Sequence, residues 1–307
     1  MKETGTSDTQ RHARGAPPNL VIEDVAITKP GKILYEKSDI TKADVAKYYA
    51  EVAQRMMPYI QNRIISIVRC PGGIDGGCFF KKHPAGDSGI VTVAVDSNNG
   101  GQEEYFYIAD VRGLIAEVQM YTLEFHTWGS KVDSLEKPDV MVFDLDPDKG
   151  MDLARVRQGV LDLKRLLDKH ALTSYLKTSG GKGYHIVVPF AQEADWGAFH
   201  GFAKSIAQTM ETTWPDRYTS NSRKGRRDGK IFIDWLRNTR GATSVAPYSI
   251  RAREGAPVSM PIFWDALATV PPQGVDIAGA IARLRDHDPW EGFFENPQSF
   301  PGYGVLT

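Results

Sequence analysis

The sequence predicts an α+β protein whose second half contains a β-α-β-β-α-β unit. Two hydrophobic runs that end in acidic residues predict buried strands, one finishing at Asp144–Asp146 and the other at Asp234. Between them lie two stretches with apolar residues at helical spacing and one Gly-rich hairpin. This order of elements is typical of ferredoxin-like and RNA-recognition-like sheets.

Length and composition predict one large domain. A chain of 307 residues that is 41% hydrophobic can bury a full core. Residues 1–18 are polar and end in two prolines, so we expect a disordered tail or a linker there. Residues 19–307 should form a single bilobed domain. Its N-terminal lobe is expected at about 19–135, its catalytic lobe at about 136–290, and a C-terminal extension at 291–307.

The first lobe is predicted to alternate helices with short strands. A possible short strand at 32–36 precedes Thr41–Asp44, which is similar to a capping box with Asp in place of Glu. This box opens an amphipathic helix that Pro58 is expected to stop. Short strands should follow at 63–69, 78–82, 90–96 and 104–109, with a second helix at about 110–121.

The second half is predicted more sharply. The strand that ends at Asp146 is followed by a helix at roughly 152–169 with apolar residues on one side. The expected hairpin consists of a strand at 175–178, a loop at 179–183 and a strand at 184–188. A helix with Trp196, Phe199, Ala203, Ile206 and Met210 at core spacing leads through a basic loop to the strand that ends at Asp234.

The charge and the hydropathy of the sequence bear on its possible ligands and its location in the cell. The net charge is −1, so no global positive field indicates nucleic acid, and only the segment 222–230 is strongly basic. The N-terminal residues are polar, and no apolar run is long enough to span a membrane. We therefore expect a cytoplasmic protein.

The two cysteines, Cys70 and Cys78, predict a reducing compartment and no disulfide framework. Together with His83 they could supply three zinc ligands, but their spacing fits no common zinc motif. Ordinary buried thiols are the favoured interpretation.

Three carboxylates predict a metal-dependent catalytic site. Because side chains alternate along a strand, Asp144 and Asp146 project from the same face. Two like charges at the end of a buried strand repel each other and lose hydration, and only a cation offsets that cost well. Asp234, on a neighbouring strand, would complete an oxygen cage for Mg²⁺ or Mn²⁺, the usual arrangement for phosphoryl transfer.

The loop from Ser179 to Gly183 predicts an anion site. Its glycines let backbone N–H groups approach an anion closely, and Lys182 adds a positive charge. It is not a Walker loop, because Gly183 stands where that motif has Ser or Thr. His185 begins the next apolar strand, where a satisfied core histidine is the alternative.

Further basic and aromatic residues suit a nucleotide and a nucleic acid. Guanidinium groups at Arg237 and Arg251 suit triphosphate binding, whereas surface arginines are the alternative, which stays open for Arg240 as well. Phe79 and Phe80 precede two lysines, a combination that favours single-strand contacts. Core packing of one of the two rings is the alternative.

Taken in order, these segments closely resemble the polymerase domain of bacterial ATP-dependent DNA ligase D. That family belongs to the archaeo-eukaryotic primase superfamily and works in non-homologous end joining. The resemblance extends from about Lys29 to Trp290. Its motifs are Val-Arg-Cys-Pro-Gly-Gly at 68–73, Phe-Phe-Lys-Lys-His at 79–83, Glu-Phe-His-Thr-Trp-Gly-Ser at 124–130, Val-Phe-Asp-Leu-Asp-Pro at 142–147, Lys-Thr-Ser-Gly-Gly-Lys-Gly-Tyr-His at 177–185, Ile-Phe-Ile-Asp-Trp-Leu-Arg-Asn at 231–238 and Ala-Pro-Tyr-Ser-Ile-Arg-Ala at 246–252.

The resemblance implies a primase-polymerase fold, with an RNA-recognition-like catalytic sheet, flanking helices and an N-terminal α/β lobe. It implies that Asp144, Asp146 and Asp234 are the catalytic metal ligands. The residues that it places at the nucleotide are His126, Ser179, Lys182, His185, Arg237 and Arg251. The residues assigned to DNA are Phe79 and Phe80 near the template, Lys32 and Lys42 at a downstream 5′-phosphate, and Lys224 and Arg226 in the basic loop.

The activity implied by the resemblance is DNA-directed nucleotidyl transfer with two divalent ions, Mn²⁺ or Mg²⁺. The enzyme would use nucleoside triphosphates, with a preference for ribonucleotides, to fill gaps and extend 3′ ends. Its expected partners are DNA ends, a ligase domain of the same polypeptide and the bacterial Ku end-binding protein. No Lys-x-Asp-Gly ligase motif is present, because Gly73–Gly76 and Arg226–Gly229 both lack the lysine.

Two other functions are compatible with parts of the sequence. A metal-dependent glycosyltransferase could use Asp144 and Asp146 but would leave Asp234 unexplained. A non-catalytic nucleic-acid-binding module would leave all three desolvated aspartates unexplained.

Overall fold

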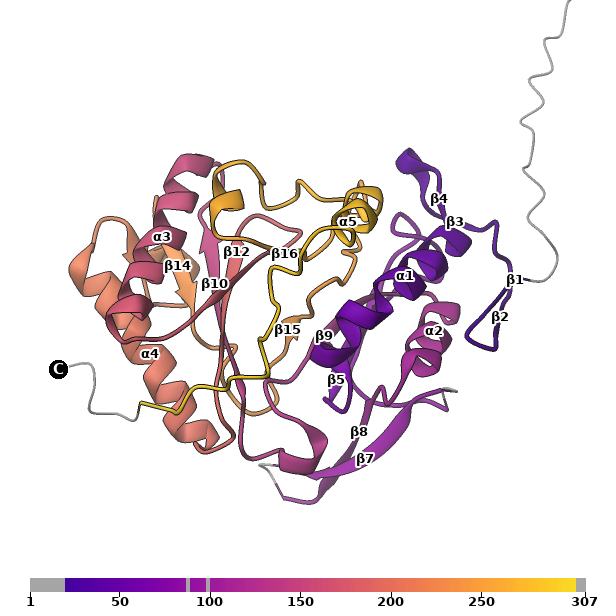
Figure 1. Cartoon of the computed structure of the whole chain (residues 1–307), viewed down its shortest axis with the longest axis horizontal. Helices are drawn as coiled ribbons and strands as arrows, with labels where there is room; N and C mark the ends of the chain where they lie inside the picture. The colour runs from indigo at the N-terminus through magenta and orange to yellow at the C-terminus, as the bar shows by residue number, and fades with distance from the viewer. Residues whose placement is uncertain (1–19, 87–88, 98–99, 302–307) are drawn as a thin grey trace, which may run out of the picture.

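Two lobes lie side by side in the computed structural model, which describes residues 20–86, 89–97 and 100–301 (Figure 1). The predicted tail at 1–18 lies outside the described residues, and so do residues 302–307 of the predicted C-terminal extension. Within the described part of the chain, no helix has both the length and the apolar character needed to cross a membrane.

The catalytic lobe is built on a six-stranded sheet. Its order is β13-β14-β10-β12-β11-β16, and the central strand β10 runs antiparallel to both β12 and β14. The strands are β10 (Val140–Pro147), β11 (Tyr175–Thr178), β12 (Tyr184–Pro189), β13 (Tyr218–Thr219), β14 (Ile231–Asp234) and β16 (Pro261–Ile262). The four inner strands have the order expected of the predicted β-α-β-β-α-β unit, whereas the two-residue edge strands β13 and β16 were not predicted.

Two helices pack against this sheet, as the sequence predicted. They are α3 (Leu153–Lys169) and α4 (Trp196–Thr213), whose first turns are capped by the side chains of Asp152 and Asp195. Both pack against β10 and against each other. A Cβ on Gly159 of α3 would meet the Leu145 side chain, so the apolar positions of β10 face the helices. Asp144 and Asp146 consequently project from the other face of the sheet.

The N-terminal lobe contains a four-stranded sheet of order β15-β9-β5-β6. The strands are β5 (Ile65–Arg69), β6 (Phe79–Lys81), β9 (Thr122–Thr127) and β15 (Ser244–Val245). Helices α1 (Lys42–Ile60) and α2 (Val111–Gln119) pack together beside β9, and β7 (Val91–Asp96) pairs with β8 (Gln102–Tyr107). The remaining elements are β1 (Leu20–Ile22), β2 (Val25–Ile27), β3 (Ile33–Tyr35), β4 (Ile40–Thr41), α5 (Ile277–Arg283) and the 3₁₀ turns η1 (Glu36–Ser38), η2 (Val132–Ser134), η3 (Lys224–Arg226) and η4 (Asp265–Ala268).

Helix α1 begins as predicted but does not end as predicted. The backbone N–H of Asp44 donates to Thr41 Oγ1 over 3.2 Å, and the N–H of Thr41 donates to Asp44 Oδ2 over 2.9 Å, which confirms the capping box. The expectation that Pro58 stops the helix is wrong, because α1 continues to Ile60. A proline in the last turn removes one hydrogen bond of the helix, and the packed apolar residues around it hold the turn.

The prediction that Cys70 and Cys78 are free thiols is also wrong, because they form a disulfide. They directly follow β5 and directly precede β6, and the antiparallel pair Arg69–Phe79 brings the two ends together. The cysteines therefore cannot act as zinc thiolates. His83 Nδ1 contacts the carbonyl oxygen of Glu104 instead, at 2.9 Å.

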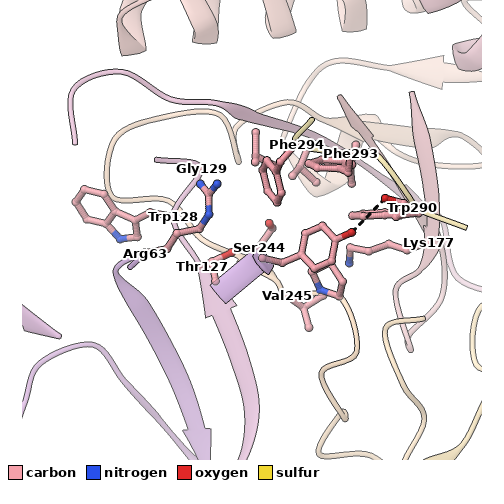
Figure 2. A pocket seen from close by; sticks show the side chains of 15 residues that line it. Arg63, Thr127, Trp128, Gly129, Lys177, Ser244, Val245, Trp290, Phe293 and Phe294 are labelled. Carbon is pink, nitrogen blue, oxygen red and sulfur yellow. Dashed lines mark hydrogen bonds between the residues drawn. The ribbon is translucent and has the colours of Figure 1, made fainter. Parts of the chain in front are cut away.

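The two lobes share a β-sheet and a hydrophobic core. β15 comes from the second half of the chain but pairs with β9 in the sheet of the first lobe. One hydrophobic core extends through both lobes. A small cavity of about 30 Å³ lies where they meet. This is room for roughly one water molecule. Figure 2 shows side chains that line it, among them Trp128 of the first lobe, Lys177 of β11, and Trp290 and Phe293 near the C-terminus. We propose that the two lobes fold as one unit.

A buried ion pair connects the lobes. Arg63 precedes β5 and Asp139 precedes β10, and the guanidinium donates to both carboxylate oxygens over 2.6 and 2.7 Å. Both side chains are less than a tenth exposed. Such a pair contributes little relative to apolar packing, but leaving one charge alone is costly.

Arg63→Met should lower the free energy of unfolding by about 3–5 kcal/mol, because it leaves the Asp139 carboxylate buried without its partner. Arg63→Met combined with Asp139→Leu should recover most of that loss. Urea unfolding measures both. Lys37→Met removes the exposed pair with Glu254 and should leave the midpoint unchanged. A double variant as unstable as Arg63→Met would contradict the conclusion that the unpaired Asp139 carboxylate causes the loss of stability.

Candidate active site

A row of four polar side chains crosses the catalytic sheet on the face opposite α3 and α4. Asp144 lies opposite Asp234 of β14 and opposite His185 of β12, and His185 lies opposite Lys177 of β11. Residues in register on antiparallel neighbours project from the same face, so the four side chains are adjacent. Two anions thus lie at one end of the row and a cation at the other.

Each carboxylate is paired with a basic side chain. Asp144 Oδ1 lies 3.4 Å from His185 Nε2, Asp146 Oδ2 accepts from Arg227 Nη1 over 2.8 Å, and Asp234 Oδ2 lies 3.1 Å from Arg237 Nε. Among the described residues, no group of three His, Cys, Asp or Glu side chains is arranged to hold a metal ion. The strands therefore bring the three carboxylates together, but Asp146 and Asp234 turn toward arginines and Asp144 turns toward the His185 imidazole. The predicted metal cage stays a prediction.

The electrostatics of this cluster fit a cation. Burial raises the pKa of Asp144 to about 6, Arg237 opposes the rise, and the charges of Asp234 and Asp146 add to it. Burial also raises the pKa of Asp234 above its ordinary value, against the charge of Arg237. Carboxylate oxygens are the donors that Mg²⁺ and Mn²⁺ prefer. The residues present therefore suit a divalent ion.

The face of the row opens into a cleft of about 320 Å³. It is lined by Asp144 and Asp146 and by all six residues predicted for nucleotide binding: His126, Ser179, Lys182, His185, Arg237 and Arg251. Segments spread over more than a hundred residues of sequence therefore converge on one polar cavity. Arg240, by contrast, pairs with Glu136 over 2.8 Å, in agreement with the alternative of a surface arginine.

The Gly-rich loop is shaped by Ser179 and pressed against the catalytic strand. Ser179 Oγ accepts from the N–H groups of Gly181 and Gly183 over 3.0 and 3.3 Å. A Cβ on Gly183 would collide with the backbone oxygen of Leu145, the residue between the two aspartates. Glycine is therefore required at 183 for the loop to lie this close to the carboxylates.

The sequence did not single out Glu124, which holds two predicted nucleotide residues in place. Its Oε2 accepts from Arg251 Nε over 3.0 Å and lies 2.8 Å from His126 Nε2, and Oε1 accepts from the N–H of Ala252 over 2.7 Å. Burial raises its pKa, but the bond with His126 and the charge of Arg251 outweigh burial and bring the pKa to about 2. The alternation of Glu124 and His126 along β9 was the available signal.

Lys177 was also not predicted. It is buried and donates to Ser259 Oγ over 2.6 Å. Burial lowers its pKa well below the usual range, and Arg251 adds to that effect. Burial and the charge of Lys177 likewise lower the pKa of His185 well below its usual range. His185 Nδ1 is buried and has no hydrogen-bond partner among the described residues, so a polar atom is available in the wall of the cleft.

Arg227 and Arg253 are two further residues of the site that the sequence analysis did not identify. Arg227 pairs with Asp146, and its guanidinium lies 3.9 Å from the centroid of the Phe232 ring. Arg253 lines the cleft beside the Gly-rich loop. Both lie in segments where several basic residues follow one another, so the sequence alone could not select between them.

The predicted DNA-binding residues lie at three separate places. Phe79 and Phe80 of β6 are 50% and 49% exposed, so the alternative that one of them packs in the core is wrong. The Phe80 ring lies 5.7 Å from the ring of His126, close to the cleft. Lys224 and Arg226 are exposed on η3.

Lys32 and Lys42 lie together in the N-terminal lobe. Their Nζ atoms are 5.0 and 4.1 Å from the centroid of the Tyr121 ring. Lys42 is buried and donates to the carbonyl oxygen of Thr28 over 2.9 Å. Burial, with the charges of Lys32 and Lys29, lowers the pKa of Lys42 to about 8. A buried lysine that lies beside other cations favours an anionic ligand.

Comparison with known proteins agrees with this geometry. Residues 41–290 match the family described as LigD, primase-polymerase domain. The multifunctional non-homologous end joining protein LigD of Pseudomonas aeruginosa is 36% identical over 293 residues, which is 92% of this chain and 34% of that protein. The bifunctional LigD of Bacillus subtilis is 30% identical over 299 residues, which is 96% of this chain and 48% of that protein. The chain thus spans about a third to a half of these relatives.

A solved structure shares the fold. The polymerase domain from Mycobacterium tuberculosis ligase D in complex with DNA superimposes with a TM-score of 0.82 at 29% identity, covering 90% of this chain and all of that one. The predicted α+β primase-polymerase fold is confirmed. These matches contradict the glycosyltransferase alternative and the alternative of a non-catalytic binding module.

Asp144→Asn should stabilise the metal-free protein at pH 8. The carboxyl pKa is about 6 in the folded protein and about 3.9 in an unfolded chain, so the folded state loses stability as the pH rises from 4 to 6. Removing the charge should gain on the order of 1–3 kcal/mol above pH 6 and nothing near pH 4. Denaturant unfolding in chelator measures this. Asp148→Asn should not stabilise, since hydrogen bonds from Gly229 and Lys149 lower the pKa of that carboxyl. An Asp144→Asn protein that is less stable than the wild type at pH 8 would contradict the conclusion that the charged Asp144 carboxylate destabilises the metal-free fold.

Proposed function

Because the chain belongs to the LigD primase-polymerase family and is a nucleotidyltransferase, we propose that it fills gaps and extends 3′ ends in non-homologous end joining. The observation that supports this most strongly is the cleft in which Asp144 and Asp146 lie beside His126, Lys182 and Arg251. Carboxylates for metal and cations for phosphate face one another there.

The proposed reaction is attack of a primer 3′-hydroxyl on the α-phosphate of a bound nucleoside triphosphate, with release of pyrophosphate. Asp144, Asp146 and Asp234 are the residues that would hold two divalent ions, Mn²⁺ or Mg²⁺. The chemistry supplied by those ions, when bound, is activation of the hydroxyl and neutralisation of the leaving group. The protein's own contribution is positioning and charge complementarity.

The residues around the Gly-rich loop would hold the triphosphate. Lys182 is exposed at the tip of the loop, and Arg251 is oriented by Glu124 and by the carbonyl oxygen of Ser179. His185, kept neutral by its surroundings, can donate or accept a hydrogen bond in the cleft wall. Arg237 would exchange its contact with Asp234 for a phosphate once that carboxylate binds metal.

The DNA contacts are proposed at the three separate surfaces. Phe79 and Phe80 offer exposed rings for stacking with template bases. Lys224 and Arg226 offer charge to a strand that approaches the carboxylates, because Arg227 of the same loop contacts Asp146. Lys32 and Lys42 offer a paired cationic site for a 5′-phosphate across a gap.

The wider setting is proposed from the relatives. Curated relatives are named as multifunctional or bifunctional end-joining proteins, and this chain covers only part of their length. We propose that it works with a ligase domain of the same polypeptide and with the bacterial Ku end-binding protein, in the cytoplasm. A preference for ribonucleotides is proposed from the family resemblance alone.

Extension of labelled gapped DNA with nucleoside triphosphates and Mn²⁺ tests the activity. Asp234→Ala should lower the rate on the order of a thousandfold, because the charge stabilisation supplied by the metal is worth several kcal/mol. Arg240→Ala, an arginine outside the cleft, is the matched control and should be as active as the wild type. Ribonucleotides should be inserted faster than deoxyribonucleotides. Near-normal extension by Asp234→Ala would refute the three-carboxylate site.

Binding of gapped DNA with a 5′-phosphate or a 5′-hydroxyl tests the lysine site. The phosphate form should bind about ten- to a hundredfold more tightly, as expected for one or two charge-assisted contacts. Lys32→Ala with Lys42→Ala should erase that difference and leave extension of a simple primer-template nearly unchanged. Lys37→Ala, whose lysine pairs with Glu254, is the control. If the double variant still distinguishes the two DNAs, the 5′-phosphate binds elsewhere.

A further inference from the structure

The Cys70–Cys78 disulfide joins the two ends of the connection between β5 and β6. The first cysteine follows Arg69 and the second precedes Phe79, which are themselves paired across the two strands. We propose that this disulfide is a thiol-exchange site whose reduction loosens β6 and weakens the binding of single-stranded template. The effect on DNA rests on the template role proposed above for Phe79 and Phe80.

The two sulfur atoms differ in their surroundings. Cys70 is buried, whereas Cys78 is exposed. A thiolate from a small-molecule or protein thiol can therefore attack Sγ of Cys78, and Cys70 leaves as a thiolate that takes up a proton. A second reductant thiolate then attacks the mixed disulfide and releases Cys78. In total, one protein disulfide and two reductant thiols become two protein thiols and one reductant disulfide.

Strand β6 is held by few contacts besides this bond. It is three residues long and lies at the edge of its sheet, where β5 is its one partner among the described strands. Lys81 Nζ lies 5.7 Å from the centroid of the Phe106 ring. Its two phenylalanine rings are about half exposed, so they bury little apolar surface. Short edge strands with few buried contacts open locally at low free-energy cost, and a covalent link at one end restricts that opening.

Movement of β6 would reach the nucleotide cleft. The Phe80 ring lies 5.7 Å from the ring of His126, which lines the cleft. A loosened strand therefore changes the surface over which a template base would stack, next to the incoming nucleotide.

The other side of the connection is held independently of the disulfide. The N–H of Cys70 donates to the carbonyl oxygen of Tyr121 over 3.0 Å, and the N–H of Ile74 donates to that of Leu34 over 2.9 Å. Lys32 Nζ donates to the carbonyl oxygen of Pro71. These bonds survive reduction, so discrimination of a 5′-phosphate should change less than template binding.

Oxidised and reduced wild-type protein, desalted to remove the reagent, should be compared by amide hydrogen exchange and by binding of single-stranded DNA. Reduction should speed exchange at residues 79–81 several-fold. It should weaken DNA binding about three- to tenfold, which is less than the loss of a full base stack. Cys78→Ser replaces the exposed cysteine and prevents the disulfide. This variant should behave like the reduced protein after both the oxidising and the reducing treatment. The 5′-phosphate preference should persist.

Four results would overturn the inference. One is mass spectrometry that finds two free thiols after treatment with oxidised glutathione. Another is equal exchange at 79–81 in both redox states, and a third is a Cys78→Ser protein that still responds to reductant. Template binding that Phe80→Ala abolishes but that is equal in both redox states also overturns it, and leaves the proposed function intact. Absence of template binding from both forms, with redox-sensitive exchange at β6, overturns the proposed template role instead.

Discussion

Burial of carboxylates beside one another on one face of the catalytic sheet is the constraint on which this structure depends. Asp144 and Asp234 are directly opposite each other on adjacent strands, and Asp146 projects beside them. Water cannot fully hydrate Asp144 and Asp234, and basic side chains lie around the cluster. Arg227 and Arg237 contact two of them, and Lys177 lies at the far end of the same row. A site of this kind is poorly stable by itself and is suited to a divalent cation.

The shape of the rest of the cleft depends on how closely the Gly-rich loop approaches the carboxylates. The Gly-rich loop reaches the catalytic strand only because Gly183 has no side chain to strike Leu145. Glu124 then ties this loop to the other lobe, since it orients Arg251, which in turn bonds the carbonyl oxygen of Ser179. The nucleotide site is therefore a joint product of both lobes. The pairing of β15 with β9 and the buried pair of Arg63 with Asp139 hold the lobes in place.

The sequence predicted the features that arise from local patterns. The strand run before Asp144, the alternation that places Asp146 on the same face, and the capping box at Thr41 each involve a few consecutive residues. It did not predict features that depend on register between distant strands. Lys177 belongs to the site because β11 and β12 pair as they do, and Glu124 matters because Arg251 lies beside it. The disulfide was missed for a similar reason, since only the hairpin brings Cys70 to Cys78. The edge strands β13 and β16 are two residues long and carry no periodic signal.

Titration of the nucleotide-free protein with Mn²⁺, followed by the electron paramagnetic resonance signal of the free ion, tests the crowded carboxylates most directly. Saturable binding is expected in the wild type, since a divalent ion relieves the repulsion of Asp144, Asp146 and Asp234. Binding should be lost in Asp144→Asn and retained in Asp148→Asn, which changes a nearby carboxylate that does not line the cleft. Equal Mn²⁺ affinity in the wild type and in Asp144→Asn would contradict a metal site built on these strands.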